Sequence, residues 1–158
     1  MRSPLHCIVG APGAGKTTVC AALARIASPA IVLDMDDLLD DDGCVLGVHI
    51  TTRAAEEIWP AYNDLWVRLL RAVGRTGDPI ILFTPALPDE LDVDAAWARL
   101  DCDDDERAGR LLLRGWSTDD VRLVQPYVDR ARELVPFGFD TTTASPDAVA
   151  ASILEWAR

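Results

Sequence analysis

The sequence predicts a three-layer α/β/α fold built on a five-stranded parallel sheet. Short apolar runs alternate with segments of helical periodicity along the chain, the order expected for a parallel sheet covered by helices. A glycine-rich loop joins the first apolar run to the first helical segment. The length of 158 residues, without a repeat or linker, predicts one domain over residues 1–158.

Short apolar runs bounded by polar or turn residues predict the strands. They are Leu5–Val9, Ala30–Leu33, Pro79–Phe83, Trp97–Cys102 and Phe137–Thr141. Periodicity and capping residues predict the helices. These are Gly15–Ala27, Thr51–Trp59, a longer helix from Pro60 to about Gly74, Asp103–Arg114, a helix capped by Ser117, and one from Ser145 to Arg158. We expect Pro126 to break or restart the Ser117 helix.

Charge and hydropathy exclude several classes of partner. A net charge of −11 repels phosphodiester backbones, so nucleic acid is not expected as a partner. The longest apolar runs are too short to span a bilayer and no signal-peptide pattern is present, so we expect no membrane partner and a cytoplasmic location. Four scattered cysteines suggest reduced core thiols. The oligomeric state stays open, with a homodimer as one option.

The segment Gly10-Ala11-Pro12-Gly13-Ala14-Gly15-Lys16-Thr17 matches the phosphate-binding pattern G-x-x-x-x-G-K-S/T between a strand and a helix. Its glycines allow backbone N–H groups to approach phosphate oxygens, and the helix start adds positive potential. Lys16 would contact the outer phosphates of ATP, the Thr17 hydroxyl would bind Mg²⁺, and Thr18 would complete the loop.

Lys16 is the only lysine among 15 basic residues, the others being arginine. The single lysine thus occupies the motif position at which a compact ammonium group must reach between phosphates. This supports the phosphate-loop prediction.

The loop, the short chain and an arginine-bearing segment after the fourth strand resemble the small P-loop kinases, among them adenylate kinase, shikimate kinase, gluconate kinase and chloramphenicol phosphotransferase. The resemblance implies a P-loop kinase fold, with an acceptor-binding insert at about 38–76 and a short lid at about 114–125. AAA-type ATPases share a similar loop but carry an acidic Asp-Glu pair after a hydrophobic strand. Here Thr84-Pro85 follows Ile80–Phe83, which disfavours that class.

Asp34 and Asp36 follow the second predicted strand in an acid–x–acid pattern similar to that of shikimate and gluconate kinases. The resemblance implies that Asp34 holds Mg²⁺ through water and that Asp36 binds the acceptor hydroxyl and takes its proton. A carboxylate in hydrogen-bond reach orients and activates a poor nucleophile. The alternative is that both aspartates only cap the next turn, and Asp37 would replace either one if the register shifts.

The acceptor pocket is expected between the phosphate loop and the insert. Its candidate residues are His49, Arg53, Trp59, Tyr62, Asn63, Trp66 and, at the end of the third strand, Thr84. Adenylate kinase-like chains carry arginines for an acceptor phosphate after the second and third strands. Arg53 is the only early arginine placed to replace them. This departure from the adenylate kinase pattern favours an uncharged or cationic hydroxylated metabolite as the acceptor.

Arg107, Arg110 and Arg114 recur along one predicted helix. The resemblance implies that an arginine near the end of this helix, Arg114 or else Arg110, stacks on adenine or closes over the phosphates. Arg122 is a further lid candidate, and the loop after the fifth strand, Thr142–Pro146, corresponds to the adenine-contacting loop. Exposed arginines paired with Asp103–Glu106 are the structural alternative.

These observations predict an ATP-dependent, Mg²⁺-assisted phosphotransferase acting on a hydroxyl of a small metabolite. A nucleoside or nucleoside-monophosphate kinase is the first alternative. A P-loop ATPase or nucleotide-binding regulator without an acceptor is the second.

Overall fold

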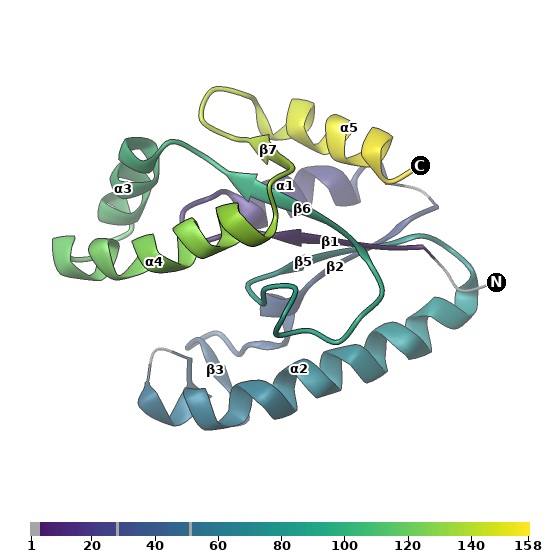
Figure 1. The fold of residues 1–158 in the computed structure, drawn as a ribbon, viewed down its shortest axis with the longest axis horizontal. Helices are drawn as coiled ribbons and strands as arrows, with labels where there is room; N and C mark the ends of the chain where they lie inside the picture. The colour runs from purple at the N-terminus through teal and green to yellow at the C-terminus, as the bar shows by residue number, and fades with distance from the viewer. Residues whose placement is uncertain (1–3, 28, 51) are drawn as a thin grey trace.

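The computed structural model describes residues 4–27, 29–50 and 52–158. Within these residues, five strands form one parallel sheet in the order β2-β5-β1-β6-β7 (Figure 1). Their bounds are β1 Leu5–Val9, β2 Ile31–Asp34, β5 Ile80–Thr84, β6 Ala96–Asp101 and β7 Gly138–Asp140. The predicted fold class is confirmed, and each predicted strand lies within a few residues of an observed one.

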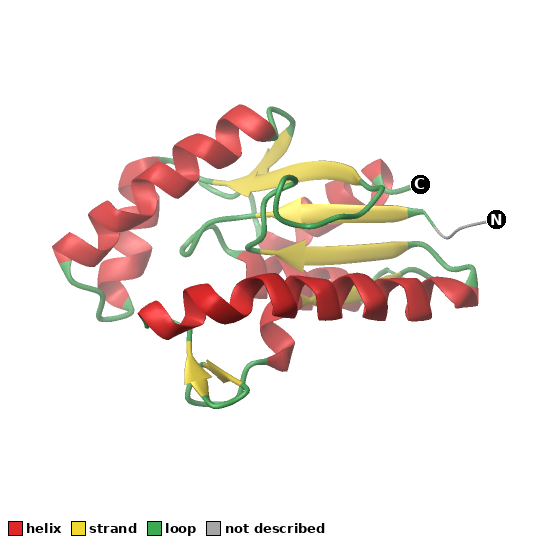
Figure 2. Ribbon diagram, turned by 60° about the horizontal axis from the view of Figure 1, so that its bottom comes forward, coloured by secondary structure: helices red, strands yellow, loops and turns green. Residues whose placement is uncertain are grey.

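Helices cover both faces of the sheet (Figures 1 and 2). Side chains alternate along β1, so Ile8 packs under α1 (Lys16–Ala24) and α5 (Pro146–Trp156). Cys7 and Val9 point to the opposite face, which is covered by α2 (Arg53–Val73) and α4 (Thr118–Leu134). α3 (Asp104–Leu113) follows β6 and packs against α4. These contacts bury β1 at the centre of three layers.

The carboxyl ends of the five parallel strands meet at one edge of the sheet. The segments that leave this edge are the glycine loop after β1, and those that start at Met35 after β2, Pro85 after β5, Cys102 after β6 and Thr141 after β7. Open α/β sheets bind ligands at this edge. The topology therefore gathers the predicted functional residues there.

The two helices predicted on either side of Pro60 are one continuous helix, α2, so this prediction is wrong; Thr51 itself lies outside the described residues. Pro126 likewise lies inside α4 and does not break it. Both prolines are on the exposed side of their helices, where water can satisfy the carbonyls left without an N–H partner. Packing of the opposite, apolar faces then keeps each helix continuous.

The polar stretch after β2 contains short elements that the sequence pattern does not reveal. A 3₁₀ turn, η1 (Met35–Leu38), is followed by a hairpin of β3 (Cys44–Val45) and β4 (Val48–His49). A second 3₁₀ turn, η2 (Gly74–Thr76), ends α2. Strands of two residues are too short to show an alternating pattern.

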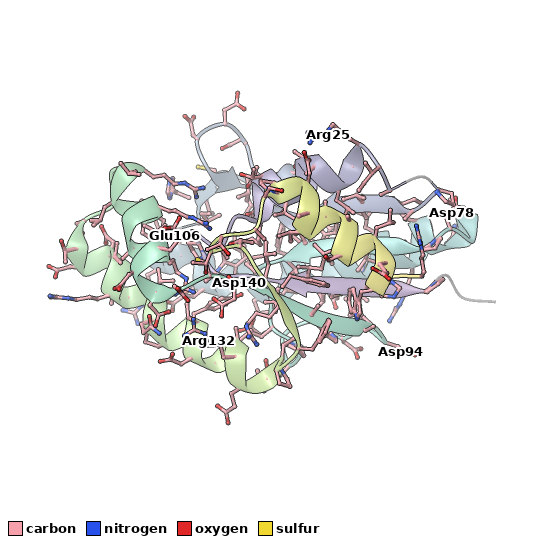
Figure 3. All side chains as sticks on the ribbon, turned by 90° about the horizontal axis from the view of Figure 1, so that it is seen from above. Arg25, Asp78, Asp94, Glu106, Arg132 and Asp140 are labelled. Atoms are coloured by element: carbon pink, nitrogen blue, oxygen red, sulfur yellow. The ribbon has the colours of Figure 1, made fainter. Side chains whose placement is uncertain are left out.

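Residues 85–95, which connect β5 to β6, form no helix. They leave a groove of about 770 Å³ against the second half of α2, lined by Val67 and Leu70 on one side and Val93 and Ala95 on the other. Figure 3 shows Asp94 of this connection at the end of the molecule opposite Glu106 of α3. The groove is therefore separate from the edge where the glycine loop lies.

Gly138 of β7 is paired so closely with β6 that a Cβ there would lie 2.5 Å from the Arg99 carbonyl oxygen. Because that atom is backbone, it cannot rotate away, and β7 would have to move. We expect Gly138→Ala to lower the free energy of unfolding by about 1–3 kcal/mol, measured by urea denaturation. Gly109→Ala is the matched control, since a Cβ at this exposed α3 position meets nothing within 4 Å. The control should gain about 1 kcal/mol, and equal midpoints for both variants would contradict the expectation.

Candidate active site

The glycine loop has the backbone geometry of an anion site. Gly13 and Gly15 have φ angles of 82° and 94°, a region that side chains with a Cβ rarely adopt. The Ala14 N–H donates to the Ala11 carbonyl (3.1 Å), which closes a turn inside the loop. α1 then begins at Lys16, and its first intrahelical bond from Val19 N–H to Gly15 O is 3.0 Å long. The N–H groups from Gly15 to Thr18 precede this bond and are available to an anion at the positive end of the helix.

The Lys16 side chain folds back over this loop. Its Nζ donates to the Gly10 carbonyl at 2.7 Å and to the Ala11 carbonyl at 3.4 Å. Burial lowers the pKa of Lys16 below its ordinary value, although the charges of Asp36 and Asp34 act to raise it. Both carboxylates are therefore close enough to act on this ammonium electrostatically, as the prediction of a shared site requires.

Asp34 and Asp36 have different surroundings although only one residue separates them. Asp34 is buried at the end of β2, and its Oδ1 accepts a hydrogen bond from the Asp36 N–H at 3.0 Å. It thus caps η1, and burial raises its pKa. Asp36 is exposed. The capping alternative describes part of what Asp34 does, whereas the carboxylate of Asp36 is open to the site.

Two predicted acceptor contacts are engaged inside the protein instead. Thr84 is fully buried, and its Oγ1 accepts from the Ala86 N–H at 2.8 Å. The buried Tyr62 donates its hydroxyl to the Met35 carbonyl of η1. Both hydroxyls thus have partners inside the protein, and the assignment of these two residues to the acceptor stays a prediction. A β-strand end and a helical tyrosine give no sequence signal that tells a wall residue from a lining residue.

His49 and Arg53 are exposed, His49 on β4 and Arg53 in the first turn of α2. In Figure 1 the β3–β4 hairpin and the start of α2 lie toward the carboxyl ends of the strands. Their assignment to the acceptor stays a prediction.

The three arginines of α3 have separate environments. Arg107 is buried and donates to the Cys102 carbonyl (2.8 Å) and to Asp104 Oδ1 (2.7 Å), so it is not an exposed surface arginine. Arg110 reaches the glycine loop, where its Nη1 donates to the Gly13 carbonyl at 3.2 Å. Arg114 ends the helix and is exposed. Arg114 is therefore the α3 arginine whose side chain is most open to a ligand.

A small cavity of about 150 Å³ adjoins the glycine loop. It is bordered by the start of α1, the end of α3 and the loop after β7, where the adenine-contacting loop is expected. Its lining residues are Gly15, Thr18, Val19, Arg110, Arg114, Thr141, Ala144 and Pro146. Thr141 is a residue that sequence reasoning missed, and its place directly after the last strand is the signal that points to it.

The predicted lid at 114–125 is a short turn followed by the first turns of α4. Ser117 caps this helix in a reciprocal pair with Asp120, as its sequence position predicts. Arg122 is exposed and pairs with Asp119 of the same helix at 3.4 Å. α4 is anchored further along by Arg132, labelled in Figure 3, whose Nε lies 2.7 Å from Asp101 Oδ2 at the end of β6.

Mg²⁺ bound with a nucleotide takes most of its ligands from phosphates and water. Thr17 is exposed in the first turn of α1, and Asp34 ends β2 and acts electrostatically on Lys16. A hydroxyl and a carboxylate are oxygen donors that suit this ion. Among the described residues, no group of three His, Cys, Asp or Glu side chains is arranged to hold a metal. The donor set thus fits an ion that arrives with the nucleotide.

None of the helices in the described residues has the length and hydropathy needed to cross a membrane. The cysteines among the described residues are free thiols; Cys7 and Cys102 are buried, and Cys20 and Cys44 are partly exposed.

A family model described as AAA domain matches residues 7–134. Among curated proteins, no sequence matches this chain at a significant level. The fold is similar to that of shikimate kinase from Acinetobacter baumannii, with 17% identity, a TM-score of 0.69 and coverage of 98% of this chain and 92% of that one. It is also similar to the fold of the tunicamycin resistance protein of Deinococcus radiodurans, with 20% identity, a TM-score of 0.72 and coverage of 98% of this chain and 95% of that one. A third similar structure is thymidylate kinase from Candida albicans, with 15% identity, a TM-score of 0.61 and coverage of 98% of this chain and 91% of that one.

Proposed function

Because this chain belongs to the AAA domain family and has the fold of small P-loop kinases, we propose that it transfers the γ-phosphate of ATP to a hydroxyl of a small metabolite. The missing Asp-Glu pair disfavoured the AAA-type ATPases, and its absence does not exclude membership of this family. The resemblance to small P-loop kinases is confirmed at the level of the fold.

The observation that carries the proposal is the convergence of Lys16, Asp34 and Asp36 at one edge of the sheet. The two carboxylates act electrostatically on the Lys16 ammonium, which itself lies on the glycine loop. The second carboxylate, that of Asp36, is exposed and is suited to accept the proton of an attacking hydroxyl.

In this proposal each residue has a stated task. Backbone N–H groups of the loop and of the start of α1 bind phosphate oxygens, and Lys16 neutralises charge on the group being transferred. Thr17 and Asp34 hold Mg²⁺, which offsets phosphate charge when bound. Asp36 orients the acceptor hydroxyl and takes its proton. Arg114 supplies a further cation on the nucleotide side.

The acceptor is proposed to be uncharged or cationic, because most arginines near the site are already engaged. Arg107 and Arg132 pair with Asp101 and Asp104, and Arg130 pairs with Asp89. Asp34, Asp36 and Asp37 make the acceptor side acidic. An acceptor with its own phosphate would meet repulsion there. Shikimate, bound in the A. baumannii structure, shows that this fold accommodates a hydroxylated metabolite in that protein.

A nucleoside or nucleoside-monophosphate kinase remains the second candidate, supported by the similarity to thymidylate kinase. It would need Arg53 to bind the acceptor phosphate. A nucleotide-binding regulator without an acceptor is the third. Cytoplasmic location, a homodimer and the absence of nucleic-acid and membrane partners stay predictions.

The test is a panel of hydroxylated metabolites, amino alcohols, nucleosides and nucleoside monophosphates, with ADP formation measured for each in the presence of ATP and Mg²⁺. We expect a neutral or cationic hydroxyl compound to raise ADP formation well above the rate without acceptor, and EDTA to abolish the rise. Stimulation by a nucleoside monophosphate alone would select the second candidate. Equal, slow hydrolysis with every compound would contradict both kinase proposals.

A further inference from the structure

Two consecutive carbonyls of the glycine loop accept hydrogen bonds from side chains that are distant in the sequence. The Thr141 hydroxyl, directly after β7, donates to the Ala14 carbonyl at 2.8 Å. Arg110 of α3 donates from Nη1 to the Gly13 carbonyl at 3.2 Å. The two side chains also bind each other, with Arg110 Nη1 3.0 Å from Thr141 Oγ1 and Nη2 2.6 Å from the Thr141 carbonyl.

Fixing a carbonyl also fixes the N–H of the same peptide group, because the group is planar and trans and the two point in opposite directions. The Gly13 carbonyl shares its peptide with the Ala14 N–H, which closes the turn onto Ala11. The Ala14 carbonyl shares its peptide with the Gly15 N–H, directly before α1. Holding the Ala14 carbonyl toward Thr141 therefore turns the Gly15 N–H away from β7, and holding the Gly13 carbonyl toward Arg110 keeps the turn closed.

The contact is tight and buried. Thr141 is 7% exposed. A Cβ placed on Gly15 would lie 3.7 Å from both Arg110 Nη1 and Thr141 Oγ1, so the pair lies directly behind this glycine. Loss of the Thr141 hydroxyl would leave the buried Ala14 carbonyl without this donor, an unfavourable state that a rotated peptide would relieve.

We propose that Thr141 and Arg110 are positioning residues that hold the glycine loop in its phosphate-binding conformation before the nucleotide arrives. This rests on the nucleotide binding in the proposed function, but not on the identity of the acceptor. It assigns Arg110 to the carbonyl side of the loop in place of the stacking role that the kinase resemblance implies. A loop ordered in advance binds phosphate without an entropic cost for ordering at that moment.

The experiment compares two ligands, ATP with Mg²⁺ and inorganic triphosphate with Mg²⁺, by titration calorimetry without acceptor. Thr141→Val removes the hydroxyl and keeps the branched shape, whereas Thr141→Ser keeps the hydroxyl. Thr76→Val is the matched control, because Thr76 is an exposed residue in η2, outside the site. We expect Thr141→Val to weaken both ligands by about tenfold, the loss of one hydrogen bond. Thr141→Ser and Thr76→Val should bind within about twofold of the original chain.

Thr141 also lines the small cavity, so it could contact the adenine base directly. Comparing ATP with triphosphate, which has no base, separates such a contact from the positioning of the glycine loop. Equal losses for ATP and triphosphate support the proposal. A loss for ATP alone would make Thr141 a base contact and overturn it, and so would unchanged binding of both. If Thr141→Val does not fold, Arg110→Met, which keeps the aliphatic stem, carries the same expectations.

Failure of this inference can be told apart from failure of the proposed function. A chain that binds ATP but phosphorylates no acceptor contradicts the kinase proposal and leaves the titrations valid. A chain that binds neither ATP nor triphosphate contradicts both.

Discussion

Lys16→Ala is expected to lower acceptor-dependent ADP formation by on the order of a thousandfold or more, because it removes the cation that neutralises the transferred phosphoryl group. Lys16 is half-buried on the loop, and its Nζ bonds to Gly10 and Ala11 are made to carbonyls that face the site. The fold should therefore survive, which thermal unfolding followed by circular dichroism will check. Initial rates at saturating ATP provide the main measurement.

Arg68→Ala is a suitable control for Lys16→Ala. Arg68 is an exposed cation of α2 paired with Asp64 at 3.3 Å, and its removal should leave the rate within about twofold, as for most surface substitutions. Lys16→Arg should also be nearly inactive, because a planar guanidinium does not reproduce the compact ammonium on the loop carbonyls. A Lys16→Ala protein that keeps a tenth of the original rate would show that the loop does not serve phosphoryl transfer.

Asp36→Asn is expected to lower kcat by about 10²–10⁴-fold while changing the Kd for ATP by less than about threefold. The amide keeps the shape of the side chain but cannot take the proton of the acceptor hydroxyl. Rapid-quench or steady-state kinetics give kcat, and titration without acceptor gives the Kd. Near-normal turnover would mean that Asp36 is not the base.

Asp37→Asn is the matched comparison, since it alters a neighbouring exposed carboxylate. The charges of Asp36 and Asp37 both act on Asp34 and on Tyr62, but that of Asp36 also acts on the Lys16 ammonium. The structure thus favours Asp36 over its neighbour. A large loss of kcat in Asp37→Asn with little change in Asp36→Asn would reverse the two assignments.

The parts of the fold that the sequence predicts are those encoded by local pattern. The strand β1, the glycine loop and the start of α1 follow one another within twenty residues, and each carries its own signal. Pro60 and Pro126 misled the helix prediction because local propensity competes with packing of the opposite helix face, and packing prevailed.

The surroundings of the candidate site residues depend on contacts between distant segments, which the sequence pattern does not reveal. Thr84 and Tyr62 looked available to a ligand, yet their hydroxyls are engaged by Ala86 and Met35. Arg110 was expected on the nucleotide, whereas its guanidinium binds the Gly13 carbonyl of the loop and the Thr141 carbonyl. Whether a polar group faces a cavity or a neighbouring backbone is decided by tertiary packing, which a single sequence does not display.

The bond from Thr141 to Ala14 joins residues 127 positions apart in the chain. During synthesis, the phosphate-loop sequence leaves the ribosome early, whereas its restraining hydroxyl belongs to the last strand of the sheet. A nascent chain that ends before β7 would carry the full glycine motif without the contact that orders it. Nucleotide affinity should then arise only once β7 is available, and would report completion of the sheet more faithfully than helix content does.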